Sequence, residues 1–102
     1  MTTPEGKVKD KLRKLLKSYG ADLYQFWPVQ SRWGTRTLDV ICWHLGVPFA
    51  VEAKRRGKDL TEYQQSTTDD MLDAGACVFR VSDDDELNVL KNWLDAGYDV
   101  FD

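Results

Sequence analysis

Histidine and cysteine are scarce in this chain of 102 residues, which contains one histidine and two cysteines. The spacing of Cys42, His44 and Cys77 does not match a zinc ribbon. Two cysteines so far apart also do not make the disulfide framework of a small secreted domain. Because both cysteines lie within apolar segments, we expect them to be reduced core residues.

Long apolar runs are also absent from the sequence. No segment approaches the roughly 20 apolar residues that a membrane-spanning helix needs, and residues 1–11 lack the apolar stretch of a signal peptide. We find no internal repeat, linker or low-complexity segment. With 42% hydrophobic residues, residues 1–102 are expected to form one compact domain in the cytoplasm, with no membrane partner.

Acidic residues are few in the first part of the chain, and basic residues are few in the second. Residues 1–60 carry twelve Lys or Arg against six Asp or Glu, whereas residues 61–102 carry two against eleven. The resulting charges of +6 and −9 make up the net −3 of the whole chain. This asymmetry indicates a polyanion partner for one face, although a solvated lysine-rich helix beside an acidic helix cap explains it equally well.

Apolar periodicity and capping residues predict three helices. In the first, Leu12 and Leu16 lie on one apolar stripe, and most of the lysines lie elsewhere. Thr3 and Pro4 begin this helix and Gly20 follows it. The first helix is predicted at about Pro4–Tyr19 and the second at Thr61–Ala74. The third follows the capping sequence Ser82–Asp85 and ends at about Ala96.

Four apolar segments predict strands: Leu23–Pro28, Thr37–Leu45, Val47–Arg55 and Ala76–Val81, the last buried by composition. A tight turn at Gly46 joins the second and third strands into an antiparallel hairpin. The second helix separates the third and fourth strands, so these two are expected to be parallel. The predicted fold is α/β in the order αβββαβα, with a mixed four-stranded sheet flanked by helices.

Three charged residues interrupt the apolar hairpin: Asp39 in one strand, and Glu52 and Lys54 at the end of the next. Ionised side chains seldom lie in such runs unless they are paired or bind a metal. Glu52 and Lys54 are two residues apart and face the same side of a strand. If Asp39 faces that side too, two carboxylates and an ammonium converge. A cross-strand salt bridge to Lys54 at a sheet edge is the alternative interpretation.

Two carboxylates and the backbone carbonyl of Ala53 form an all-oxygen set suited to Mg²⁺ or Mn²⁺. Such an ion polarises a phosphodiester and lowers the pKa of a bound water, while Lys54 orients that water or stabilises charge in the transition state. The sequence therefore suggests metal-dependent hydrolysis of a phosphodiester.

Two further polar residues each have two interpretations. Glu5 lies on the apolar stripe of the first helix, where it points toward the site or only interacts with the helix dipole. Thr61 and Gln64 form the pattern of a capping box, in which the Gln64 side chain reaches back to the Thr61 amide. On spacing alone, the dipole and the capping box are the favoured interpretations.

The segment LDVICWHLGVPFAVEAK, followed by LTEYQQ, resembles the VRR-NUC (virus-type replication–repair nuclease) domain of the PD-(D/E)XK nuclease superfamily. The resemblance covers Glu5 to about Val89 and implies a restriction-endonuclease-like core. Leu38 stands where the family usually has a proline before its metal-binding Asp. The resemblance implies catalytic roles for Glu5, Asp39, Glu52, Lys54 and Gln64, with Asp39, Glu52 and the Ala53 carbonyl as metal ligands and Glu5 as a ligand through water.

The same resemblance implies a Mg²⁺- or Mn²⁺-dependent DNA endonuclease of the stand-alone, phage-encoded type, which works in the cytoplasm of the host cell. Its expected substrate is branched or flapped DNA or a four-way junction, and its expected state is a homodimer, which supplies a second active site. The competing interpretations are a catalytically silent DNA-binding or accessory module with this fold, and a subunit of a restriction or recombination complex.

Basic and aromatic residues predict the surfaces that meet these partners. Tyr24, Phe26, Trp27 and Trp93 offer more aromatic area than a core of this size readily holds, which makes them candidates for a dimer surface. Phosphate contacts to DNA are expected from Arg32, Arg36, Arg55, Arg56 and Lys58.

Overall fold

The structure is a computed structural model that describes residues 3–29 and 37–97. In chain order its helices and strands are α1 (Pro4–Lys17), β1 (Leu23–Phe26), β2 (Val40–His44), β3 (Val47–Ala53), α2 (Glu62–Asp73), β4 (Cys77–Val81) and α3 (Asp84–Asp95). The predicted α/β fold and the order αβββαβα are confirmed. None of the described helices is long and apolar enough to cross a membrane.

A mixed four-stranded sheet in the spatial order β1-β2-β3-β4 forms the centre of the fold. β2 is antiparallel to both β1 and β3, whereas β4 is parallel to β3. Parallel neighbours need a crossover connection, and α2 lies in it. Leu45 and Gly46 join β2 to β3 with φ angles of 50° and 85°. Positive φ at both central residues is typical of a type I′ turn, which matches the twist of the two strands.

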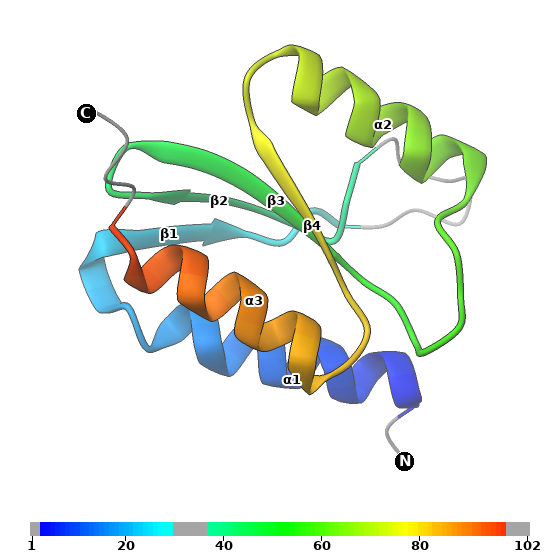
Figure 1. Cartoon of the computed structure of the whole chain (residues 1–102), viewed down its shortest axis with the longest axis horizontal. Helices are drawn as coiled ribbons and strands as arrows, with labels where there is room; N and C mark the ends of the chain where they lie inside the picture. The colour runs from blue at the N-terminus through cyan, green and yellow to red at the C-terminus, as the bar shows by residue number, and fades with distance from the viewer. Residues whose placement is uncertain (1–2, 30–36, 98–102) are drawn as a thin grey trace.

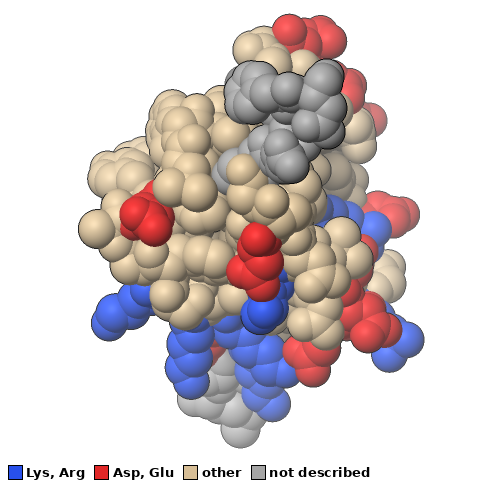
Figure 2. Space-filling view, turned by 60° about the vertical axis from the view of Figure 1, so that its left-hand side comes forward, with Lys and Arg blue, Asp and Glu red and all other residues tan. Residues whose placement is uncertain are grey.

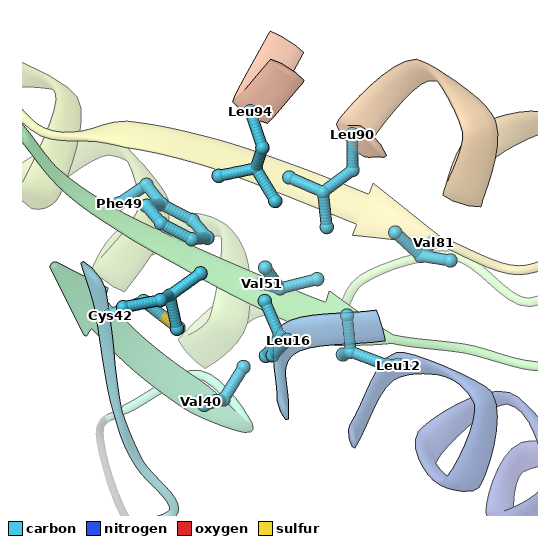
Figure 3. Close-up of a cluster of buried hydrophobic side chains, with 10 residues drawn as sticks. Leu12, Leu16, Val40, Cys42, Phe49, Val51, Val81, Leu90 and Leu94 are labelled. Atoms are coloured by element: carbon cyan, nitrogen blue, oxygen red, sulfur yellow. The ribbon is translucent and has the colours of Figure 1, made fainter. Parts of the chain in front are cut away.

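The helices cover both faces of the sheet (Figure 1). α1 and α3 lie side by side on one face, and α2 lies on the other. The main core is on the first face, where alternate residues of the strands meet leucines of α1 and α3 (Figure 3). Its most deeply buried side chains are Leu12, Leu16, Val40, Cys42, Phe49, Val51, Val81, Leu90 and Leu94.

The strands differ from the predictions in both their ends and the burial of β4. β2 begins at Val40, three residues later than predicted, so Asp39 lies just before this strand rather than within it, and β4 begins one residue later, at Cys77. β1, β2 and β3 end two, one and two residues earlier than predicted, at Phe26, His44 and Ala53. β4 was predicted to be buried, but four of its five residues are partly exposed because it is an edge strand. An unpredicted 3₁₀ turn, Gly20–Asp22, follows α1. Both cysteines are free, as predicted, and burial raises the pKa of the Cys42 thiol to about 12.

Two of the aromatic residues predicted for a dimer surface pack within the fold instead. Trp93 lies beside buried Leu94 on the core-facing side of α3, and its ring centroid is 5.3 Å from that of Phe49. Trp27 packs against the core, and the Arg13 guanidinium covers its ring at 4.2 Å from the centroid. α1 and α3 thus supply these tryptophans with partners inside the fold, and Tyr24 and Phe26 are the more exposed of the four predicted residues.

Candidate active site

Asp39 and Glu52 lie on the face of the sheet that α2 covers. Glu52 alternates along β3 with the buried residues Val51 and Ala53, so its side chain points away from the core under α1 and α3. Asp39 directly precedes β2, whose first residue, Val40, pairs with Val51. The pleat of the two neighbouring strands therefore places Asp39 and Glu52 on the same side of the sheet. The sequence alone did not show which side Asp39 faces.

Two hydrogen bonds tie these acids together across β2 and β3. The Asp39 amide donates to Glu52 Oε1 at 3.0 Å, and the Ala53 amide donates to Asp39 Oδ2 at 2.9 Å. Both acids are buried, with 8% of Asp39 and 3% of Glu52 exposed. The carboxylates are thus held by backbone groups in a nearly dry site, where charge interactions are stronger than in water.

Two more side chains of the predicted site meet at Glu52. Lys54 Nζ lies 3.8 Å from Glu52 Oε2, and the Gln64 side chain donates from Nε2 to the same oxygen at 2.7 Å. Lys54 is only 6% exposed, and its amide donates to the Val81 carbonyl oxygen at 2.9 Å. Lys54 therefore forms an ion pair, but the pair lies within one segment of the chain and is buried, whereas the alternative interpretation was a cross-strand pair at a sheet edge.

Gln64 forms the predicted capping box and also contacts Glu52. Its Oε1 accepts from the Thr61 amide at 3.0 Å, and its own amide donates to Thr61 Oγ1 at 3.2 Å, which completes the capping box at the start of α2. Its Nε2 is left to bind Glu52. The neighbouring Gln65 instead donates to Asp69 on the exposed side of α2. The cap therefore fixes the orientation of the amide group that supports the site.

The environment of Glu52 disfavours its charged form. Burial, and then the charge of Asp39, raise the pKa of Glu52 from 4.5 to about 7. Lys54, the hydrogen bond from the Asp39 amide and Lys9 act in the opposite direction but do not balance the first two effects. Ionising both acids is thus unfavourable in the metal-free chain, and a bound divalent cation would favour the ionised pair.

The Asp39 and Glu52 carboxylates suit Mg²⁺ or Mn²⁺ chemically. Mg²⁺ is commonly bound through one or two carboxylates and keeps several of its waters, and Mn²⁺ prefers the same oxygen ligands. Within the described ranges, no three Asp, Glu, His or Cys side chains approach closely enough to enclose a metal ion. Asp39 and Glu52 are therefore the two side chains of this group that could serve as carboxylate ligands.

Lys9, which was not predicted, connects Glu5 to this group. Lys9 Nζ lies 3.4 Å from Asp39 Oδ1 and 3.9 Å from Glu5 Oε2. Most lysines of α1 were expected to face solvent, and Lys9 was overlooked for that reason. The signal was its spacing, because Glu5, Lys9, Leu12 and Leu16 follow one another at intervals of four, three and four residues. Such residues share one face of a helix.

The loop after β3 carries the basic residues predicted to bind DNA. Arg55, Arg56 and Lys58 are all exposed. Arg80 Nη2 donates to the Lys58 carbonyl oxygen at 2.6 Å. Arg80 pairs in register with Glu52, so this hydrogen bond attaches the loop to the sheet next to the candidate site. The other two predicted DNA-binding residues, Arg32 and Arg36, lie outside the described residues.

A second group of basic residues lies on α1. Lys and Arg side chains gather along the lower edge of the molecule (Figure 2), at the level where α1 lies in Figure 1. Lys11 Nζ lies 2.9 Å from Asp84 Oδ1, at the first residue of α3. The lysine-rich helix beside an acidic helix cap is therefore present, and it accounts for part of the charge asymmetry.

The sequence matches no known protein-family model and no curated protein, and no solved structure matches the fold. The geometry and chemistry of the Asp39–Glu52 group therefore form the basis for interpreting the function.

Proposed function

We propose that this chain is a metal-dependent DNA endonuclease, a stand-alone member of the VRR-NUC branch of the PD-(D/E)XK nucleases. The observation that carries the proposal is the buried pair Asp39–Glu52, with Lys54 and Gln64 both in contact with Glu52. These residues come from three separate segments of the chain and meet on one side of the sheet. Burying two acids is costly unless they are compensated, so their convergence favours a functional site over a structural one.

In this proposal, each residue of the group has a separate task. Asp39 and Glu52 hold a Mg²⁺ or Mn²⁺ ion, which when bound polarises the phosphodiester and lowers the pKa of a water. The Ala53 carbonyl and, through water, Glu5 are the further ligands. Gln64 keeps the Glu52 carboxylate in one orientation through its 2.7 Å hydrogen bond. Lys54 orients the attacking water or stabilises the negative charge that develops on the phosphate.

The second candidate function is a catalytically silent DNA-binding module. Binding DNA needs exposed cations that meet phosphates, and Arg55, Arg56 and Lys58 supply these without any help from buried acids. The Asp39–Glu52 pair would then destabilise the domain and repel the ligand. Because Lys54 and Gln64 are also arranged around the pair, catalysis explains more of the structure than binding alone does.

Cleavage of defined DNA substrates tests the proposal. The purified chain would be incubated with supercoiled plasmid, 5′ and 3′ flaps and a four-way junction, each with Mg²⁺, Mn²⁺ or chelator. We expect cleavage that needs the metal and is faster on the branched substrates than on linear duplex. If no substrate is cut with either metal, the chain is not a nuclease and the binding module becomes the better account.

Removing the two arginines after β3 is expected to weaken DNA binding. Each phosphate contact contributes about −0.9 to the slope of log K against log salt concentration, so Arg55→Gln with Arg56→Gln should make that slope shallower by about two. The matched control removes two exposed cations from α1, Lys14→Gln with Lys17→Gln, and should leave the slope unchanged. Fluorescence anisotropy over a series of KCl concentrations measures both variants. If the slope becomes shallower only in the Lys14→Gln, Lys17→Gln control, the DNA-binding surface lies on α1 instead.

The proposed homodimer forms through an aromatic surface of β1 and β2, made of Tyr24, Phe26 and Trp43. These side chains are 62%, 51% and 47% exposed. Tyr24 pairs with Trp43 across the strands, and Phe26 lies on the same face as Tyr24. The first two were predicted for this role, and Trp43 joins them in place of Trp27 and Trp93. A row of large aromatic side chains at a sheet edge favours association.

A single charge in this surface should convert the dimer to a monomer. Trp43→Lys places an ammonium among the aromatic rings of the contact, where it is not paired. Size-exclusion chromatography with light scattering measures the molar mass, and Val89→Lys, at a residue 60% exposed on α3, is the control. A monomeric wild-type protein, or a Trp43→Lys protein that stays dimeric, would rule out this surface.

A further inference from the structure

The Lys9 ammonium occupies a specific place among the acids of the site. It lies between Glu5 Oε2 and Asp39 Oδ1, at 3.9 and 3.4 Å. The helix fixes this position, because Lys9 is one turn from Glu5 and lies on the same stripe as buried Leu12 and Leu16. Lys9 is therefore directed at the sheet by packing of α1, rather than by chance contact of a mobile surface side chain.

The hydrogen bonds of the two carboxylates show why this contact matters. Asp39 Oδ2 accepts from the Ala53 amide, Glu52 Oε1 from the Asp39 amide, and Glu52 Oε2 from Gln64. These three donors are backbone groups or a side chain held by a helix cap. In the described part of the chain, the contact found at Asp39 Oδ1 is the Lys9 ammonium. Oδ1 is thus the carboxylate oxygen whose partner can leave most easily.

The two lysines of the site differ in their freedom to move. The Lys54 side chain is 7% exposed, and its residue is bound to β4 through the backbone. The Lys9 side chain is 28% exposed, on a helix that flanks the sheet. An ammonium on a partly exposed four-carbon stem can swing into water at little cost, whereas a buried one cannot.

We propose that Lys9 is the exchangeable counter-ion of the site: its ammonium neutralises Asp39 in the metal-free protein and is displaced from Oδ1 when a divalent cation binds. This inference rests on the proposed metal site, and it assigns to that site a residue that limits its affinity. Displacement costs the Lys9–Asp39 and Lys9–Glu5 contacts, and an ammonium that stays nearby repels the divalent ion. Lys9 therefore stabilises the buried Asp39–Glu52 pair in the metal-free protein and lowers the affinity of this pair for the metal.

Metal binding without DNA tests this inference separately from catalysis. Lys9→Met keeps most of the apolar stem of Lys9 and removes its charge, and it is expected to bind Mn²⁺ at least about tenfold more tightly than wild type at neutral pH. Lys11→Met is the matched control, because it removes the same charge from the same helix at an exposed ion pair with Asp84. Titration of free Mn²⁺ followed by electron paramagnetic resonance measures all three dissociation constants. A Lys9→Met affinity equal to or weaker than that of wild type would overturn the inference, as would an equal gain in Lys11→Met.

A measurement on the wild-type chain covers the case in which Lys9→Met does not fold. In a Mg²⁺ titration followed by NMR of lysine-labelled protein, the ¹³Cε signal of Lys9 should shift and saturate, while that of Lys11 stays in place. A Lys9 signal that does not move up to saturating Mg²⁺ would contradict the exchange. If Lys9 responds as expected but no DNA substrate is cut, the counter-ion assignment stands and the nuclease proposal fails.

Discussion

Replacing Lys54 by methionine is expected to lower the rate of DNA cleavage by about 10²–10³-fold, the effect of removing one preorganised charge from a transition state. Methionine fills a similar volume, and the backbone hydrogen bond from residue 54 to the Val81 carbonyl is preserved. Asp39 and Glu52 keep their mutual hydrogen bonds, because Lys54 takes no part in them. The loss should therefore appear in the cleavage rate under single-turnover conditions, and affinity for DNA should stay nearly unchanged.

Lys58→Met is the matched control for this experiment. Lys58 lies four residues further along the same loop, is exposed, and is one of the residues proposed to contact phosphate. Its loss should weaken DNA binding several-fold and leave the rate of the bound complex nearly as in wild type. If Lys54→Met cuts DNA at the wild-type rate, or if it loses binding as Lys58→Met does, then Lys54 has no catalytic role.

Glu52→Gln is expected to make the stability of the metal-free domain less dependent on pH between 4.5 and about 7 than that of wild type. The raised pKa means that the folded chain binds a proton at Glu52 between pH 4.5 and about 7, where the unfolded chain has released it. Below pH 4.5 the Glu52 carboxyl is protonated in both the folded and the unfolded chain, so its burial does not lower the free energy of unfolding through ionisation. As pH rises from 4.5 through the folded-state pKa of about 7, the free energy of unfolding of wild type falls by about 3 kcal/mol relative to that of a protein with a neutral residue at position 52.

The comparison is made by urea unfolding with chelator present, over a pH range that begins below 4.5 and ends above 7. The side-chain amide that Glu52→Gln introduces does not titrate, and any loss from its altered hydrogen bonds is constant over this range. The free energy of unfolding of Glu52→Gln should therefore increase relative to that of wild type as pH rises. Glu62→Gln, at an exposed residue in the first turn of α2, is the control for the loss of a carboxyl group outside the candidate site. A Glu52→Gln difference that does not change between pH 4.5 and about 7 would mean that Glu52 releases its proton at the same pH in the folded and the unfolded chain.

The order of elements was predictable because the local signals agreed with one another. Thr3, Thr61 and the acidic run before α3 are helix caps in the structure, and Thr61 forms the predicted capping box. Gly46 lies in the hairpin turn at a positive φ, as its sequence context indicated. The ends of the strands were less predictable, because pairing with neighbours sets where a strand stops and a single sequence does not contain the register.

The site was predicted in part, from charged residues that lie in apolar segments. Asp39, Glu52 and Lys54 could be found because charge is unusual there. Lys9 could not be distinguished in this way, since a lysine among many on a basic helix looks like a solvent contact. Its role depends on how α1 docks against the sheet, which is a property of tertiary packing. Trp93 shows the same limitation, because α3 and β4 create a core for it that composition does not reveal.

The most direct test of the central claim compares wild type with Asp39→Asn on supercoiled plasmid and a labelled four-way junction. Asparagine keeps the shape of Asp39 and an oxygen for the Ala53 amide, but it removes one of the two charges proposed to bind the metal. We predict that wild type cleaves in Mg²⁺ or Mn²⁺ and not with chelator, and that Asp39→Asn is at least about 10³-fold slower while it still binds the junction. Equal cleavage by the two proteins, or cleavage by wild type in chelator, would contradict the assignment of the Asp39–Glu52 pair as a metal-dependent nuclease site.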